Sequence, residues 1–149
     1  TGIKTYIKGV KLIRKKIPDF KFEIIGDGKF KKEIEKDFKV LGFKKDPLMH
    51  FEKYNFAFVS RYLSILEAMA AKKLVFAVYD NPLKKDYLEM TPFSKSIVIF
   101  NSPSELASRV LFYLNNQDEK EKMVNGACNW VKSQTWEKLV NVYLKLWNK

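Results

Sequence analysis

The stretch "FVSRYLSILEAMAAKKLVFAVY", Phe58 to Tyr79, carries the pattern of a strand, a helix and a second strand. The flanking segments Asn55–Val59 and Leu74–Tyr79 are short and continuously apolar, which is typical of strands buried on both faces. Between them, Leu63–Lys72 is rich in small and aliphatic residues and predicts a helix. This order favours a parallel sheet that is covered by helices on both faces.

The same alternation continues on either side of that stretch. Further strands are predicted at Phe20–Ile25, Leu41–Phe43 and Ser96–Phe100. Helices are predicted at Ile3–Ile13, Phe30–Leu41, Pro47–Lys53, Pro82–Met90, Pro103–Leu114, Asp118–Lys132 and Trp136–Trp147. No linker divides the chain, so we expect one α/β domain over residues 1–149, a Rossmann-like doubly wound parallel sheet of about five strands with helices on both faces. Right-handed crossovers would bring the strand-to-helix turns to one edge, where helix N-termini bind ligands.

Composition excludes several classes of protein. No apolar run approaches the roughly 20 residues that cross a bilayer, and "TGIKTYIKGVKLIRKK" (residues 1–16) has charges in every turn, unlike a signal peptide. Cys128 is the single cysteine and falls in an apolar helical stripe, so we expect it in the core of a protein from a reducing compartment. His50 has no cluster of metal-ligating residues near it in sequence, and no metal site is predicted.

The formal net charge of +11 indicates affinity for phosphate groups, or simply a lysine-rich solvated surface. A nucleotide, a nucleic acid and an anionic membrane would each provide such groups. Charge alone does not choose among these partners.

One carboxylate, Glu67, lies in the otherwise apolar helix of the opening stretch. It stands three residues after Ser64, which is the spacing of a capping box worth about 1 kcal/mol to a helix. The alternative is that Glu67 lies in the first turn and faces a ligand. Spacing alone favours the cap.

The ordered motifs resemble the C-terminal, donor-binding domain of family 4 nucleotide-sugar glycosyltransferases, which have the GT-B fold. The resemblance rests on "GIKTYIKGVKLI" (2–13), "PDFKFEIIGDG" (18–28), "LGF" (41–43), "LEAMAAKKLVFAV" (66–78), "SPSELASRVLFYL" (102–114) and "SQTWEKLVNVYLKLW" (133–147). It covers essentially the whole chain. It implies half of a GT-B fold, with the last helix at about 136–148 packing towards an N-terminal domain.

This resemblance also implies roles for individual residues. The glutamate that precedes "AMA" in the family holds the donor ribose, a role that passes to Glu67. Helix amides near Leu63 and Ser64 would face the pyrophosphate, and the nucleobase would pack near Gly42, Phe43 and Lys44. We therefore expect metal-independent binding of a nucleotide sugar such as a UDP-sugar, with no further cofactor.

The sequence departs from the family pattern in two places. Where the family has a second glutamate followed by Gly-Phe-Gly, this chain has Ser60, Arg61 and Tyr62, whose side chains would have to contact phosphate or sugar differently. Thr1 stands at the place of a family lysine that neutralises pyrophosphate, a cation that Lys84 or Lys85 would have to replace. The family's preceding strand and acceptor-binding N-terminal domain have no counterpart in this sequence.

The sequence thus predicts the donor-binding part of a retaining glycosyltransferase, acting in cell-envelope glycan or glycolipid synthesis and not catalytic alone. No catalytic residue is assigned. The alternative is a non-catalytic basic Rossmann-like domain that binds nucleic acid or serves protein or membrane association. Tyr6 fits the buried stripe of its helix and not a base-stacking site, which weighs against nucleic acid. We expect a cytoplasmic protein, with peripheral contact at the inner face of the membrane as one option.

Two structural expectations complete the prediction. Strand residues should form the core, namely Ile24, Ile25, Phe56, Phe58, Val75, Phe76 and Val78. By contrast, aromatic and aliphatic residues of the last helix should be exposed, because they would face the absent domain. These residues are Trp136, Leu139, Tyr143 and Trp147.

Overall fold

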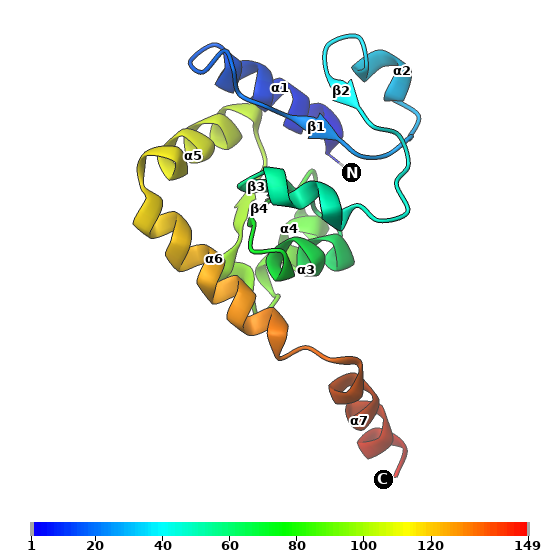
Figure 1. Ribbon diagram of the computed structural model, residues 1–149. Helices are drawn as coiled ribbons and strands as arrows, with labels where there is room; N and C mark the ends of the chain where they lie inside the picture. Colours follow the sequence, from blue (N-terminus) through cyan, green and yellow to red (C-terminus); the bar gives the residue numbers. More distant parts are fainter. Residues whose placement is uncertain (1, 149) are drawn as a thin grey trace.

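The computed structural model of the protein describes residues 2–148 and has the expected α/β architecture (Figure 1). Its strands are β1 (Glu23–Ile24), β2 (Lys39–Val40), β3 (Phe56–Phe58), β4 (Leu74–Val78) and β5 (Val98–Phe100). Its α-helices are α1 (Ile3–Arg14), α2 (Lys31–Ile34), α3 (Tyr62–Ala70), α4 (Pro82–Glu89), α5 (Pro103–Asn115), α6 (Gln117–Lys132) and α7 (Trp136–Trp147). Two 3-10 helices are η1 (Leu48–Lys53) and η2 (Ser94–Ser96).

The strands are parallel, as predicted, but they form two sheets and not one. One sheet has the order β3-β4-β5, with Phe58 opposite Phe76 and Phe76 opposite Val98. The other contains only β1 and β2, with Glu23 opposite Lys39. No ladder joins β1 to β3, and the two edges border a cleft instead.

The central strand β4 is buried along its whole length and separates two apolar layers. Leu74, Phe76 and Val78 pack with α1 and α5 on one face. On the other face, Val75 and Ala77 pack with α3, α4 and α6. Side chains of a strand alternate between faces, so this continuous apolar run confirms the sheet covered on both sides.

Helices α1 and α5 lie against each other closely on the first of these faces. Gly9 of α1 makes this approach possible, since a Cβ atom there would stand 2.6 Å from Cδ2 of Leu106. A third apolar cluster, built on Val10, Phe22, Ile34 and Phe38, joins α1 to the small β1–β2 sheet. The two sheets are therefore connected mainly through α1.

Several predicted boundaries near β2 are wrong. The helix predicted at Phe30–Leu41 is only one turn long, because Phe38 turns into the third cluster and the chain resumes as β2 at Lys39. The strand predicted at Leu41–Phe43 lies earlier, at Lys39–Val40, and Gly42 adopts a left-handed conformation with φ of 69°. Buried contacts outside the local sequence decide both boundaries.

The expected core is confirmed at Val75, Phe76 and Val78, which are buried. The prediction is wrong for Ile24, Ile25, Phe56 and Phe58, which are only partly buried. These residues belong to the two strand edges that border the cleft. Their exposure therefore follows from the split of the sheet.

The last helix, α7, extends away from the body of the molecule (Figure 1). None of its residues is buried, and Trp136 and Trp147 are 79% and 76% exposed. Leu139 and Tyr143 are also exposed, so the predicted uncovered surface is confirmed. Among residues 2–148 no helix combines the length and the apolar content needed to span a bilayer. Cys128 is buried, as expected.

Candidate functional site

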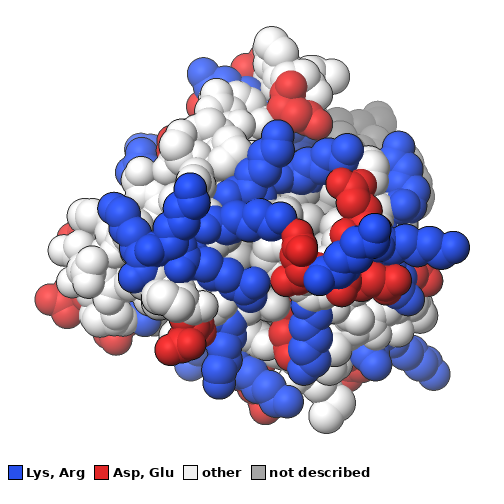
Figure 2. All heavy atoms as spheres, turned by 90° about the horizontal axis from the view of Figure 1, so that it is seen from above, with Lys and Arg blue, Asp and Glu red and all other residues white. Residues whose placement is uncertain are grey.

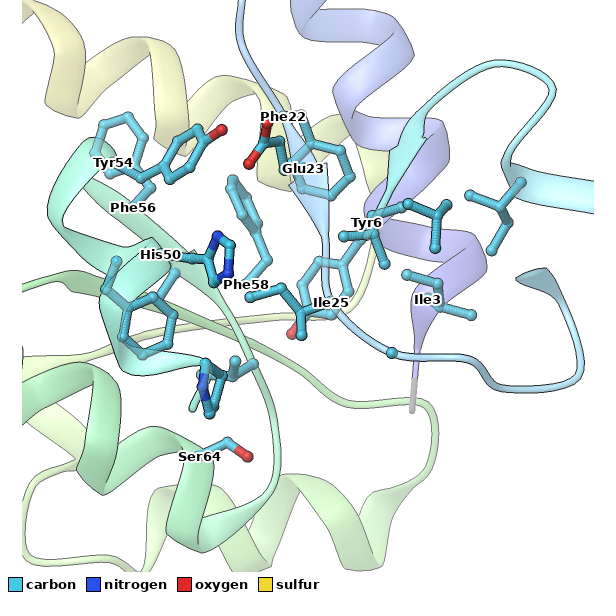
Figure 3. Close-up of a pocket in the computed structure, with 18 of the residues that line it drawn as sticks. Ile3, Tyr6, Phe22, Glu23, Ile25, His50, Tyr54, Phe56, Phe58 and Ser64 are labelled. Carbon is cyan, nitrogen blue, oxygen red and sulfur yellow. The ribbon is translucent and has the colours of Figure 1, made fainter. Parts of the chain in front are cut away.

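A cleft of about 1030 Å³ lies between the two sheets (Figure 3). Its walls are mainly apolar. The β1 side contributes Phe22, Ile24 and Ile25, the β3 side contributes Phe56, Ala57 and Phe58, and α1 contributes Ile3 and Tyr6. This apolar cavity was not predicted from the sequence. The alternation in "FKFEII" indicates a strand, but it does not show that one edge of this strand lacks a neighbouring strand in the sheet.

Two contacts hold the walls together across the cleft. The rings of Phe22 and Phe58 meet edge to face with their centroids 5.4 Å apart. The second contact is a hydrogen bond that Glu23 of β1 accepts from Tyr54. Within its own sheet Glu23 also forms an ion pair with Lys39, and the two interactions lower the pKa of its carboxyl group. For Tyr54, burial together with that carboxylate raises the pKa to about 12.

The hydroxyl group of Tyr6 ends the pairing of β3 with β4. It donates a hydrogen bond to the Phe76 carbonyl oxygen at 2.9 Å and accepts one from the Val78 amide at 3.1 Å. It thereby satisfies the Val78 amide, which lies beyond the end of β3, and shares the Phe76 carbonyl oxygen with the Val59 amide. The chain can then leave the sheet at Ser60, whose side chain is buried and forms a hydrogen bond with Tyr6.

Several polar residues of the cleft lining lie at the connection between β3 and α3. Ser60, Arg61, Ser64 and Glu67 line the cleft there, and Phe43 and Lys44 line it from the loop after β2. We call these six residues, five of which are polar and one aromatic, the polar rim. Six of the nine predicted site residues are thus brought together by the tertiary structure.

The other three predicted site residues do not line the cleft. Tyr62 packs against Phe93 with ring centroids 5.8 Å apart, and Leu63 is 66% exposed. Gly42 accepts a hydrogen bond from the Gly26 amide at 2.8 Å, so it anchors the loop that carries Phe43 and Lys44.

The capping interpretation of Glu67 is wrong. Helix α3 begins at Tyr62, after Arg61 as the N-cap residue, and no side chain caps it. Ser64 is therefore already inside the helix. Glu67 lies in the second turn, one turn later than predicted, where it is exposed and lines the cleft. The first amides of α3 have no side-chain partner, which leaves a region of positive potential beside the polar rim.

The two lysines considered as phosphate ligands have different surroundings. Lys84 donates a hydrogen bond from Nζ to the Ser60 carbonyl oxygen at 2.6 Å, so its charge lies next to the polar rim. Lys85 pairs with Glu89 at 3.8 Å and lines a second, smaller hollow. Lys84 is thus the better placed cation. Thr1, whose place belongs to a lysine in the resembling family, lies outside the described residues.

Basic side chains crowd the face of the molecule that carries α1 and α2, with acidic residues scattered among them (Figure 2). On α1 the exposed lysines are Lys4, Lys8 and Lys11, and Lys15 follows as the exposed C-cap residue. Lys11 pairs with Asp37 at 2.5 Å, and Lys4 lies 4.5 Å from the Phe30 ring centroid. Within residues 2–148, no three histidine, cysteine, aspartate or glutamate side chains converge as metal ligands would.

Comparison with known proteins identifies the family and the fold type of this chain. Residues 1–130 match the family described as Glycosyl transferases group 1. A crystal structure of TarM superposes with a TM-score of 0.77 at 22% sequence identity, over 99% of this chain and 32% of the TarM chain. The chain therefore spans about a third of the length of that structure, and the likeness establishes a Rossmann-like half of a GT-B fold. No curated protein matches the sequence significantly. The chain belongs to the group 1 glycosyl transferases.

Proposed function

We propose that the polar rim binds the nucleotide of a sugar-nucleotide donor. The observation that carries this proposal is the convergence of Ser60, Arg61, Ser64 and Glu67 beside the uncapped N-terminus of α3. Unpaired helix amides favour anions, and a pyrophosphate is the anion that a nucleotide sugar would bring there. The chain would act as the donor-binding part of a retaining glycosyltransferase for envelope glycans or glycolipids.

Each group of the rim suits one part of such a donor. The exposed Glu67 carboxylate can accept two hydrogen bonds from the vicinal hydroxyls of ribose. Arg61 and Lys84 supply positive charge near the pyrophosphate, the former with a fork of donors that fits phosphate oxygens. Phe43, which is 75% exposed, offers a ring on which a base can stack. Glu67 is the single carboxylate of the rim, and we propose that donor binding is metal-independent and persists in EDTA.

Sugar transfer would need protein beyond these residues. The chain covers 32% of the TarM chain, and we propose that a separate acceptor-binding domain provides the rest of the active site. The exposed aromatic side chains of α7 are a suitable surface for that domain, because exposed apolar patches mark contact sites. We therefore expect no transferase activity from residues 1–149 alone.

Titration calorimetry tests the donor-binding proposal directly. UDP, UDP-glucose and ADP are titrated into the protein at low and moderate salt, with a single-stranded oligonucleotide as a comparison. We expect saturable binding of at least one nucleotide with little dependence on salt. Absence of nucleotide binding, with oligonucleotide binding that weakens steeply as salt rises, would instead support a nucleic-acid-binding domain.

The basic face over α1 and α2 favours a second function, contact with an anionic membrane surface at the cytoplasmic side (Figure 2). Surface lysines contribute about 1 kcal/mol each to such binding. Co-sedimentation with vesicles containing phosphatidylserine should exceed that with neutral phosphatidylcholine vesicles. The paired change Lys8→Glu in α1 and Lys15→Glu at its C-cap should abolish the difference, whereas Lys122→Glu and Lys132→Glu on α6 should reduce it only slightly.

A further inference from the structure

Lys31, the first residue of α2, is a partly buried cation in the lining of the cleft. Its ammonium group reaches the turn after β2, since a Cβ atom built on Gly42 would stand 3.7 Å from Nζ of Lys31. Lys39, which is close to it in the chain, is paired with Glu23. By contrast, no carboxylate of residues 2–148 lies within ion-pair distance of Lys31. Partial burial removes water from this charge without providing a partner, so the ammonium group is available to a ligand.

The turn that Lys31 reaches also carries the exposed aromatic ring of the polar rim. The Leu41 amide donates a hydrogen bond to the Ile24 carbonyl oxygen at 2.8 Å, and the Gly42 carbonyl oxygen accepts one from the loop after β1. Phe43 follows directly and lines the cleft. These bonds fix the backbone that carries Phe43. A flat ring and a cation beside the preceding residue therefore lie at the same end of the cleft.

The charged side chains of the cleft lining at this turn donate hydrogen bonds and cannot accept them. Lys31 and Lys44 both line the cleft, and an ammonium group has donors only. Asp27, in the loop after β1, does not line the cleft. The carboxylates that do line it belong to α3, to β1 and to the segment before β1, namely Glu67, Glu23 and Asp19.

Nucleobases differ in what they present to such a donor. Uracil carries carbonyl oxygens on its ring, and guanine has the neighbouring acceptors O6 and N7. Cytosine and adenine present an exocyclic amino group, which is itself a donor, at the corresponding position. An ammonium group that faces an amino group leaves both without a partner, and polar sites reject closely similar ligands mainly in this way.

We propose that Lys31 selects the base of the donor, and that it favours a keto base, uracil or guanine, over an amino base, cytosine or adenine. The inference rests on the proposed nucleotide site, because it requires the base to stack on Phe43. Stacking itself does not distinguish the bases, since every base has a π face. The choice therefore depends on the hydrogen bond that Nζ of Lys31 donates to the keto oxygen.

Calorimetric titration of UDP, CDP, GDP and ADP at one fixed salt concentration tests this selection. UDP and CDP share the ribose, the pyrophosphate and the ring size, and GDP and ADP form the corresponding purine pair. In the pair that binds more tightly, we expect the affinity of the keto nucleotide to exceed that of its amino counterpart about tenfold or more, the scale of one hydrogen bond to a charged group. The affinity of UDP relative to GDP then identifies which keto base the site takes.

Variants of α2 assign the preference to one side chain. Lys31→Met keeps the length of the side chain but removes the donor, and it should abolish the preference within the pair even if the lost charge weakens both nucleotides equally. Lys31→Arg keeps donors and should preserve the preference. Lys32→Met is the matched control, because Lys32 is the next residue, is exposed and does not line the cleft. Thermal midpoints show that each variant is folded.

Two results would overturn this inference and leave donor binding itself supported. One is equal affinity within both pairs, or tighter binding of the amino nucleotides. The other is an unchanged preference in folded Lys31→Met, which would assign the choice of base to other groups. If none of the four nucleotides bound, this inference and the proposed function would fail together, so the two failures can be told apart.

Discussion

The phenolic oxygen of Tyr6 in α1 lies 2.9 Å from the carbonyl oxygen of Phe76 in β4 and donates a hydrogen bond to it. A helix side chain thus does what a neighbouring strand would do for the backbone of β4. The same oxygen accepts a hydrogen bond from the Val78 amide. This arrangement lets the chain leave β3 and form the polar rim, because β4 keeps its hydrogen bonds without a longer partner.

Removal of that hydroxyl group should therefore destabilise the protein. Tyr6→Phe would leave the Val78 amide and one acceptor site of the Phe76 carbonyl group buried without this partner. We expect the free energy of unfolding to fall by about 1–3 kcal/mol, the usual cost of such groups. Chemical denaturation measures the loss. Tyr143→Phe on the exposed helix α7 is the control and should change stability by less than about 0.5 kcal/mol.

Alkaline pH should destabilise the fold through its tyrosines. Burial raises the pKa of Tyr6 above its ordinary value, and it raises that of Tyr54 to about 12. In the unfolded chain these groups ionise near pH 10. Since the folded state holds their protons longer, the contribution of these tyrosines to stability is constant below that pH and falls as pH rises from about 10 to 12.

Thermal midpoints measured from pH 7 to pH 11 would test this dependence. The slope above pH 10 should be shallower in Tyr6→Phe, because one of the responsible groups is absent. An unchanged midpoint over that range would contradict the prediction.

The close packing of α1 on α5 makes Gly9 hard to replace. In Gly9→Ala the new Cβ atom would stand 2.6 Å from Cδ2 of Leu106 and 3.2 Å from its Cβ atom. Overpacking of this kind costs about 1–3 kcal/mol. Gly126→Ala in α6 is the contrasting change, since it meets only the small side chain of Ser96. It should be neutral or should stabilise the helix by up to about 1 kcal/mol. Equal effects of the two changes in urea unfolding would disprove the packing argument.

The residue that follows the C-cap of helix α3 is a lysine, where glycine is the usual residue. Lys72 has a φ of 56°, and its amide donates to the Met69 carbonyl oxygen at 3.1 Å. A left-handed conformation costs a side-chain-bearing residue about 1–2 kcal/mol. Lys72→Gly should therefore raise stability by up to about 1 kcal/mol, after allowance for the greater freedom of glycine in the unfolded chain. Lys72→Ala should bring no such gain, which separates the backbone effect from loss of the charge.

Glu67 can now be tested without interference from capping. Glu67→Gln should leave the free energy of unfolding within about 0.5 kcal/mol of the original, because the side chain caps nothing. Affinity for UDP or a UDP-sugar should fall by about 1–3 kcal/mol, the scale of a lost charge-assisted hydrogen bond. Glu121→Gln, an exposed change on α6, should leave that affinity unaltered. If folded Glu67→Gln bound nucleotide as before, Glu67 would have no part in the site.

The sequence alone was enough to predict the order of elements and the two-sided burial of β4. Hydrophobic periodicity is a local property, and "LVFAV" is apolar at every position. The exposure of Trp136 and Trp147 was also predicted, from the resemblance of the last helix to one that contacts another domain. Four residues of the polar rim could be listed for the same reason, since "VSRYLSILE" (59–67) runs from the end of a recognisable strand into a helix.

Only the tertiary structure decided that the sheet is split, that a cleft separates its parts, and that α3 starts at Tyr62. Strand pairing joins residues far apart in the chain, and two-residue strands such as β1 and β2 are too short for a periodic signal. The hydroxyl group of Tyr6 illustrates the same limit. Its apolar ring fits the stripe of α1, but its partners in β4 lie 70 and 72 residues away. No local pattern in the sequence encodes such a contact, because it exists only once α1 has packed on the sheet.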